Sequence, residues 1–156
     1  MSIGYALLAS SGLCAIAAAL EGVCAGRNVK SFFSTLRFPP YSAPLWVWSI
    51  IGGLYYVIFW FVTYRLVRLD SSVIRNAGLA LVLFMMIVNA LTNYIIFRAR
   101  NLRLSFAVGC LFPFLDIALL LCLVQVDTIA AWALVPYLIY RVYAVWWGYR
   151  LWELNP

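Results

Sequence analysis

Two oppositely charged residues, Asp116 and Arg141, stand in the middle of long apolar stretches. An ionisable side chain in hydrocarbon is costly unless it is paired or wet. Asp116 lies 11 residues before Asp127, and Arg141 lies 14 residues after it. If Asp127 marks a turn between antiparallel helices, a rise of about 1.5 Å per residue leaves a depth difference of roughly 4 to 5 Å. We therefore predict an Asp116–Arg141 ion pair, which either joins two helices or presents one member to a ligand.

Other polar and aromatic side chains also allow two interpretations, one structural and one functional. Asn89 and Asn93 share one helix face, where they either hydrogen-bond to another helix or contact a ligand. Glu21, near the end of the first apolar stretch, is compatible with a place at the membrane interface and is assigned no further role. Several aromatic residues lie deep in apolar stretches, where they either pack helices together or line a pocket for a flat ligand such as a porphyrin or sterol: Trp48, Tyr55, Tyr56, Tyr137 and Tyr140.

Metal and enzyme chemistry find little support in the residue types. The sequence has no histidine, which excludes imidazole metal sites and histidine-based triads. Its four cysteines form no C-x-x-C pair and mostly lie in apolar stretches, where thiols usually pack as small side chains: Cys14, Cys24, Cys110 and Cys122. We therefore predict no metal site, no covalently bound cofactor and no enzyme.

Composition identifies the solvent around these residues. Of 156 residues, 67% are hydrophobic and 10% are charged, whereas soluble domains average about half and a quarter. This excludes a water-soluble globular domain, and despite a net charge of +6 it leaves too little polar surface for binding nucleic acid. The basic charge is therefore interpreted against a lipid bilayer.

Five apolar stretches are long enough to cross that bilayer, since a helical crossing needs about 20 residues. We predict an all-α integral membrane protein, a five-transmembrane-helix bundle forming a single domain over residues 1–156. The predicted helices span about 3–23, 45–64, 77–97, 104–126 and 128–152. Because no Lys or Arg precedes Arg27, the first helix is interpreted as retained and not as a signal peptide.

The connections predict a lid and an orientation. The long first loop, residues 24–44, contains three prolines, so it must lie at the interface or cap the bundle. Seven Lys and Arg residues fall on the side of this loop and the carboxyl end, against three on the other side. The first loop is therefore expected on the cytoplasm-like side.

Several motifs resemble the translocator protein family, the TspO/MBR or tryptophan-rich sensory proteins. Pro39-x-Tyr41-x-x-Pro44-x-Trp46 leads into the second helix. Further matches are Val135-Pro136-Tyr137-Leu138 in the fifth helix, Asn89 and Phe97 in the third, Ala144, and the closing Leu154-Asn155. The resemblance implies a small, often dimeric receptor that binds tetrapyrroles, such as porphyrin or haem, or sterols under the first loop. It implies these ligand-binding residues: Tyr41, Trp46, Asn89, Pro136, Tyr137, Tyr140 and Ala144.

The sequence departs from the family where tryptophans are replaced by Gly52, Thr92 and Tyr140, so we do not expect the porphyrin photochemistry attributed to some members. The departures leave a second interpretation open, a structural accessory subunit of a respiratory-type membrane complex that kept the fold and lost ligand binding. The expected partners are lipid and a small hydrophobic ligand, or a second copy or neighbouring subunits. Because the sequence is divergent, we expect a mitochondrial membrane, with the bacterial inner membrane as the alternative.

Overall fold

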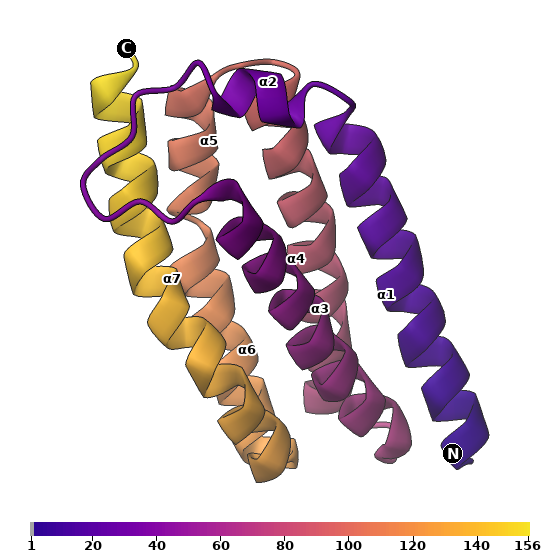
Figure 1. Cartoon of the computed structure of the whole chain (residues 1–156). Coiled ribbons are helices and arrows are strands. Elements are labelled where there is room, and N and C mark those ends of the chain that lie inside the picture. The colour runs from indigo at the N-terminus through magenta and orange to yellow at the C-terminus, as the bar shows by residue number, and fades with distance from the viewer. Residues whose placement is uncertain (1) are drawn as a thin grey trace.

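The computed structural model describes residues 2–156, which form seven helices and no strand. The helices are α1 (Ile3–Ala25), α2 (Val29–Phe33), α3 (Leu45–Arg68), α4 (Val73–Phe97), α5 (Leu102–Gly109), α6 (Phe112–Val126) and α7 (Thr128–Leu154). Figure 1 shows the long helices lying side by side, with α2 across one end and α5 leading into α6. Within residues 2–156, α1, α3, α4, the α5–α6 segment and α7 are each long and apolar enough to cross a membrane.

The turn between α3 and α4 is shorter than predicted. α3 continues four residues past Tyr64, because Arg65 and Arg68 occupy its last turn, where cations interact favourably with the carbonyl end of a helix. α4 begins at Val73, four residues before the predicted start. Its first turn is capped by the Ser72 hydroxyl, which accepts a hydrogen bond of 3.2 Å from the amide of Arg75. Charged residues therefore mark the ends of these helices less sharply than the sequence interpretation assumes.

The predicted helix over residues 104–126 is two helices in the structure. α5 ends at Gly109 and α6 begins at Phe112, with a turn at Cys110 and Leu111 between them. Pro113 lies in the first turn of α6, where its missing amide hydrogen costs least. The same proline could not donate to the hydrogen-bond ladder of a continuous helix, so the break has a local cause.

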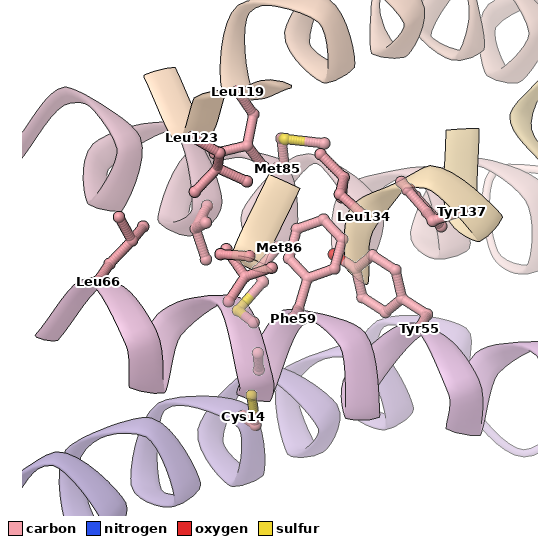
Figure 2. Close-up of a cluster of buried hydrophobic side chains, with 14 of the residues drawn as sticks. Cys14, Tyr55, Phe59, Leu66, Met85, Met86, Leu119, Leu123, Leu134 and Tyr137 are labelled. Atoms are coloured by element: carbon pink, nitrogen blue, oxygen red, sulfur yellow. The ribbon is translucent and has the colours of Figure 1, made fainter. Parts of the chain in front are cut away.

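The helices pack around an apolar core. α1 contacts α3 and α4, while α7 contacts α3, α5 and α6. Figure 2 shows the side chains that meet between these helices, and several of them are completely buried, including Phe59, Met85, Leu119, Leu123 and Leu134. Large apolar side chains also cover the outside of the bundle, among them Leu8, Ile16, Phe114, Trp132 and Ile139. Apolar residues on both the inside and the outside suit a bundle that lipid surrounds.

The first loop and the carboxyl end of the chain meet at one end of the bundle (Figure 1). The side chain of Asn155 donates to the backbone carbonyl of Arg37 at 2.8 Å, and its Oδ1 accepts from the Arg37 amide at 2.9 Å. At the same end, Arg98 donates to the carbonyl of Val23 at 2.7 Å, which ties α4 to α1. The first loop is therefore attached to the end of α7 by hydrogen bonds between the Asn155 side chain and the Arg37 backbone.

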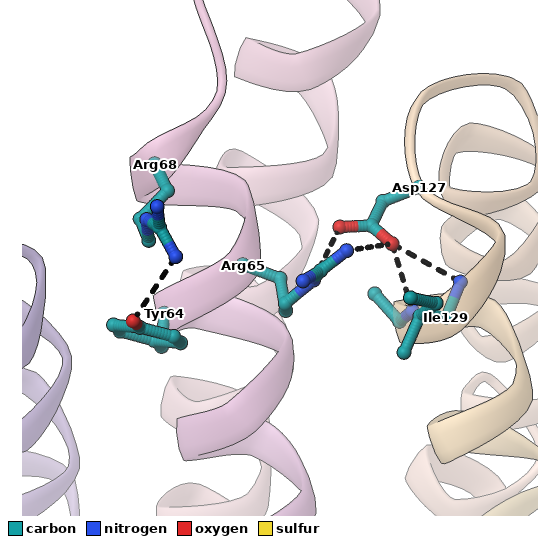
Figure 3. A network of polar contacts seen from close by, with 6 residues as sticks. Tyr64, Arg65, Arg68, Asp127 and Ile129 are labelled. Atoms are coloured by element: carbon teal, nitrogen blue, oxygen red, sulfur yellow. Dashed lines mark hydrogen bonds and ion pairs between the residues drawn. The ribbon is translucent and has the colours of Figure 1, made fainter. Parts of the chain in front are cut away.

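Asp127 organises the opposite end (Figure 3). Its buried carboxylate accepts two hydrogen bonds from Arg65 of α3, at 2.6 and 3.0 Å. It also caps α7, accepting from the amides of Ile129 and Ala130 at 3.0 and 3.1 Å. Burial alone would raise the pKa of Asp127, but these hydrogen bonds outweigh it and hold the pKa below its ordinary value. Asp127 thus links the start of α7 to the end of α3.

The link makes stability depend on pH in a defined direction. Because the pKa of Asp127 is lowered on folding, its stabilisation is fully present above the unfolded pKa of about 3.9 and is lost as pH falls through the folded pKa. Asp127→Asn keeps a capping oxygen but loses the ion pair. We expect it to lower stability near neutral pH by about 1 to 2 kcal/mol, reduced by the partial exposure of Arg65.

Unfolding of both proteins in detergent, followed by tryptophan fluorescence between about pH 3 and pH 7, measures this difference. We expect the gap between wild type and Asp127→Asn to close as the solution is acidified. Glu153→Gln is the matched control, because Glu153 pairs with Arg150 on the exposed last turns of α7. A gap that stays constant across the whole pH range would contradict the assignment.

Candidate ligand-binding cavity

The first loop covers the bundle by contacts with α3 and α7. The Trp147 indole donates to the Ser42 hydroxyl at 2.8 Å, and the Tyr143 hydroxyl donates to the backbone carbonyl of Tyr41 at 3.0 Å. The ring of Trp48, at the start of α3, lies 4.5 Å from the ring of Trp147 between centroids. The Trp48 indole also donates to the backbone carbonyl of Ala43 at 3.0 Å, so the loop is hydrogen-bonded to both helices.

A cavity of about 280 Å³ lies beneath this loop. Phe33 and Leu36 of the first loop line it, together with residues of α1, α3, α4, α5, α6 and α7. Its wall combines aliphatic residues with aromatic ones, which are Phe33, Trp48, Tyr55, Phe97, Phe106, Phe112, Tyr137, Tyr140 and Trp147. A small polar set interrupts that wall, comprising Glu21, Asn89, Thr92, Asn93, Ser105 and Arg141. An apolar wall with a few convergent polar groups is typical of small-molecule sites.

Four of the residues implied by the resemblance line this cavity: Asn89, Tyr137, Tyr140 and Ala144. Gly52 and Thr92, which stand where the family has tryptophans, line it too. No heavy atom lies within 4 Å of the position that a Cβ would take on Gly52. The replacement of large rings by small side chains therefore leaves space along this wall.

The structure does not bring three other residues into the cavity: Tyr41, Trp46 and Pro136. Tyr41 is 91% exposed and has a positive φ of 64°, so its side chain points away from the bundle, while its carbonyl accepts from Tyr143 of α7. Trp46 is 66% exposed, because it lies two residues from Trp48 and hence on nearly the opposite face of the helix. Pro136 is exposed beside the buried Tyr137. The residues of these motifs are close in sequence, but their side chains do not lie on one surface of the bundle.

The predicted ion pair is present. Arg141 Nε lies 3.0 Å from Asp116 Oδ2, and the Asp116 side chain is only 1% exposed. The guanidinium also lies over the rings of Phe112 and Tyr137, at 4.2 and 4.7 Å from their centroids. The second carboxylate oxygen of Asp116 is buried without a hydrogen-bond partner. Of the two charged residues, Arg141 is the member that lines the cavity.

Glu21 occupies a position that the sequence interpretation missed. Its side chain lines the cavity and accepts hydrogen bonds from Asn89 and Asn93 of α4, at 2.9 and 3.1 Å. It also accepts from the hydroxyl of Tyr56 of α3 at 2.5 Å. Glu21 lies four residues before the end of α1, and its side chain turns toward the bundle, a direction that was not predicted. The Asn89–Asn93 pair was the available signal, since two aligned amides need a partner on a facing helix.

Comparison with known proteins agrees with the architecture. Residues 10–153 match the TspO/MBR family, so the match includes nearly all of the chain from α1 to α7. No curated protein matches the chain. Since the matched region contains the cavity-lining residues and the long apolar helices, the family extends over the whole bundle and not over one motif. This chain belongs to the TspO/MBR family, a family of membrane proteins.

Proposed function

We propose that this chain crosses a membrane five times and binds a flat hydrophobic ligand, a tetrapyrrole or a sterol, in the cavity under the first loop. The observation that carries the proposal is the cavity itself, which is lined by aromatic and aliphatic residues and a few polar groups. Burial of a flat apolar ligand between such rings is favourable, because apolar surface is removed from water and because the ligand stacks on the aromatic rings. Asn89 and Arg141 are the groups that would orient its polar substituents.

The size of the cavity suggests how a ligand enters. Its volume of about 280 Å³ lies near the lower end of the range for small-molecule pockets, roughly 300 to 1,000 Å³. A tetrapyrrole or sterol therefore requires the first loop to shift outward. The loop is held by single hydrogen bonds such as Trp147 to Ser42, each of which contributes only about 1 kcal/mol. We propose that it acts as the lid of the site.

A structural accessory subunit is the second candidate. The outward side of α1 supports it, because nothing lies within 4 Å of the positions that a Cβ would take on Gly4, Gly12 or Gly22. Small residues of this kind allow close approach of a neighbouring membrane helix. Under this alternative the chain purifies as a colourless part of a large assembly, whereas the leading proposal implies a small oligomer that binds pigment. For location we propose a mitochondrial membrane, with the bacterial inner membrane as the alternative.

Ligand binding is tested by titrating the purified protein with haem or protoporphyrin and following visible absorbance. Replacing Tyr137 and Asn89 together with alanine removes one aromatic wall and one polar group. We expect the dissociation constant to rise about tenfold or more. Trp46→Ala is the matched control, because this exposed side chain lies outside the cavity, and it should leave affinity unchanged. Equal affinities of wild type and the double variant would remove this site assignment.

The role of the ion pair is tested by removing one partner and then both. Arg141→Met leaves a buried, unpaired Asp116, so we expect it to lower stability by about 3 to 5 kcal/mol. Adding Asp116→Leu to the same protein should restore most of that loss, since no charge then remains unpaired. Unfolding in detergent measures stability, and the pigment titration is repeated on the double variant.

The double variant separates the two readings of the pair. Weaker ligand binding in a stably folded double variant assigns Arg141 to the site, whereas full affinity assigns the pair to helix packing alone. If Arg141→Met is as stable as wild type, the buried pairing described here is contradicted.

A further inference from the structure

We infer that the turns after α1 and α4 bind the headgroup phosphate of an anionic phospholipid through Arg27, Arg98 and Arg100. These turns lie at the end of the bundle that the first loop covers (Figure 1). They line a second cavity, of about 340 Å³, whose wall comprises residues 25–28, Phe97, Arg98 and Arg100. The inference rests on the proposed membrane crossing, to which it adds a lipid partner, and it does not depend on what the cavity under the first loop binds.

Gly26 lets the side chain of Arg98 reach the end of α1. Gly26 follows α1 with a φ of 75°, a conformation that glycine adopts without strain. A Cβ on Gly26 would lie only 3.1 Å from Nε of Arg98, so the missing side chain leaves room for the guanidinium. The Nη2 group of Arg98 donates to the carbonyl of Val23 at 2.7 Å. This bond fixes the guanidinium beside the turn after α1, and within residues 2–156 its other N–H groups have no partner.

Arg100 is held beside the same turn by aromatic rings. Its φ of 51° lies in the left-handed region, which residues other than glycine rarely adopt. Its guanidinium carbon lies over the ring of Phe32, at 5.4 Å from the centroid. The ring of Phe32 in turn meets that of Phe97 edge to face at 6.2 Å, and Phe97 lines the second cavity. Arg98 and Arg100 therefore both lie against the turn that carries Arg27.

Positive charge at this end of the bundle is largely unmatched. Two side-chain carboxylates belong to this end: Glu153 pairs with Arg150, and Glu21 accepts hydrogen bonds from neutral donors inside the bundle. Among residues 2–156, no arginine of the second cavity forms an ion pair. Against these two carboxylates stand seven cationic side chains: Arg27, Lys30, Arg37, Arg98, Arg100, Arg103 and Arg150. An anion in the second cavity would reduce the repulsion among its three arginines.

The residue type and its depth point to phosphate. A guanidinium presents several N–H groups in one plane and binds phosphate oxygens in pairs, and no carboxylate in the wall of the second cavity competes for them. The cavity lies where two apolar helices end, which is the level of the lipid headgroups if these helices cross a bilayer. Phosphate is the anionic group that phospholipids present at that level, and basic pockets between membrane helices bind such headgroups.

The helix surfaces that lead to the second cavity favour a lipid over a soluble phosphate compound. Leu20 and Val23, near the end of α1, are 43% and 67% exposed. Leu91 and Tyr94, near the end of α4, are exposed as well. Acyl chains can cover such apolar side chains, whereas a soluble phosphate compound contacts none of them. Headgroup and chains together therefore match what the two helices present.

The inference is tested by native mass spectrometry of the whole chain in neutral detergent, titrated with phosphatidylglycerol or phosphatidylcholine of equal acyl chains. We expect the first phosphatidylglycerol to bind wild type at least about tenfold more tightly than phosphatidylcholine, whose choline cancels the phosphate charge. Replacing Arg27 and Arg100 together with glutamine should reduce this preference to about twofold or less. This double variant keeps Arg98, whose bond to Val23 ties α4 to α1.

Lys30→Gln combined with Arg103→Gln is the matched control. It removes two positive charges from the same end of the bundle, but neither residue lines the second cavity. The control should keep the preference of wild type for phosphatidylglycerol. An equal loss in both double variants would assign the preference to the general positive charge of this end and overturn the site. Equal binding of the two lipids by wild type would also overturn it, and this comparison needs no variant.

Soluble anions test the source of the phosphate. Glycerol 3-phosphate carries the phosphate without acyl chains, and at the ionic strength of a sodium chloride control it should displace no more phosphatidylglycerol than the salt does. Stronger displacement would assign the second cavity to a soluble phosphate compound. Protoporphyrin should bind wild type and the Arg27 and Arg100 double variant alike. Weaker binding by the variant would place these arginines at the carboxylates of that ligand, and either result would overturn the lipid assignment.

The failure of this inference can be distinguished from the failure of the proposed function. If both lipids bind wild type equally, the membrane crossing stands and the phosphate site fails. If neither lipid binds, the proposed crossing loses its support together with the site. If protoporphyrin does not bind wild type but phosphatidylglycerol is preferred, the proposed ligand-binding function fails and the lipid site stands.

Discussion

The arrangement of this bundle depends on the lack of hydrogen-bond partners in hydrocarbon. A polar side chain that faces lipid pays its full desolvation cost, so the costly groups of the long helices turn inward and meet one another. Asp116 therefore pairs with Arg141, and Glu21 collects amide and hydroxyl donors from α3 and α4. The same constraint acts at the helix ends, where Asp127 caps α7 and binds Arg65 at once. The polar groups that turn inward lie beside aromatic rings, and together they line the candidate site. The site therefore follows from the pairing of polar side chains inside the bundle.

Much of this fold could be predicted from the sequence, because hydrocarbon thickness and the cost of charge act over long stretches of chain. The apolar helices lie near their predicted ranges. The Asp116–Arg141 contact follows from counting residues on either side of Asp127, since helical rise converts sequence distance into depth. Asn89 and Asn93, one turn apart, were expected to hydrogen-bond to another helix or to contact a ligand, and both donate to Glu21 of α1.

Features that depend on the direction of a side chain were harder to predict from the sequence. The resemblance grouped Tyr41 and Trp46 with the site, yet a positive φ and a helix face turn these two rings outward. The place of Glu21 near a helix end indicates only its depth, and depth does not specify the face of a helix. Pro113 could have indicated the break between α5 and α6, but a proline in an apolar stretch is compatible with either a kink or a new start. In each case the deciding quantity is rotation about a helix axis or one backbone dihedral angle.

Our central proposal is that the long helices cross a bilayer in alternating directions, so that lipid forces their polar groups inward. Its most direct test is the reaction of single cysteines, in a protein whose four native cysteines are replaced, with a membrane-impermeant maleimide in oriented vesicles. The account predicts that cysteines at Ser34 and Asn101 react from one side, and cysteines at Ser71 and Gln125 react from the other. Reaction of Ser34 and Ser71 positions from the same side would contradict it.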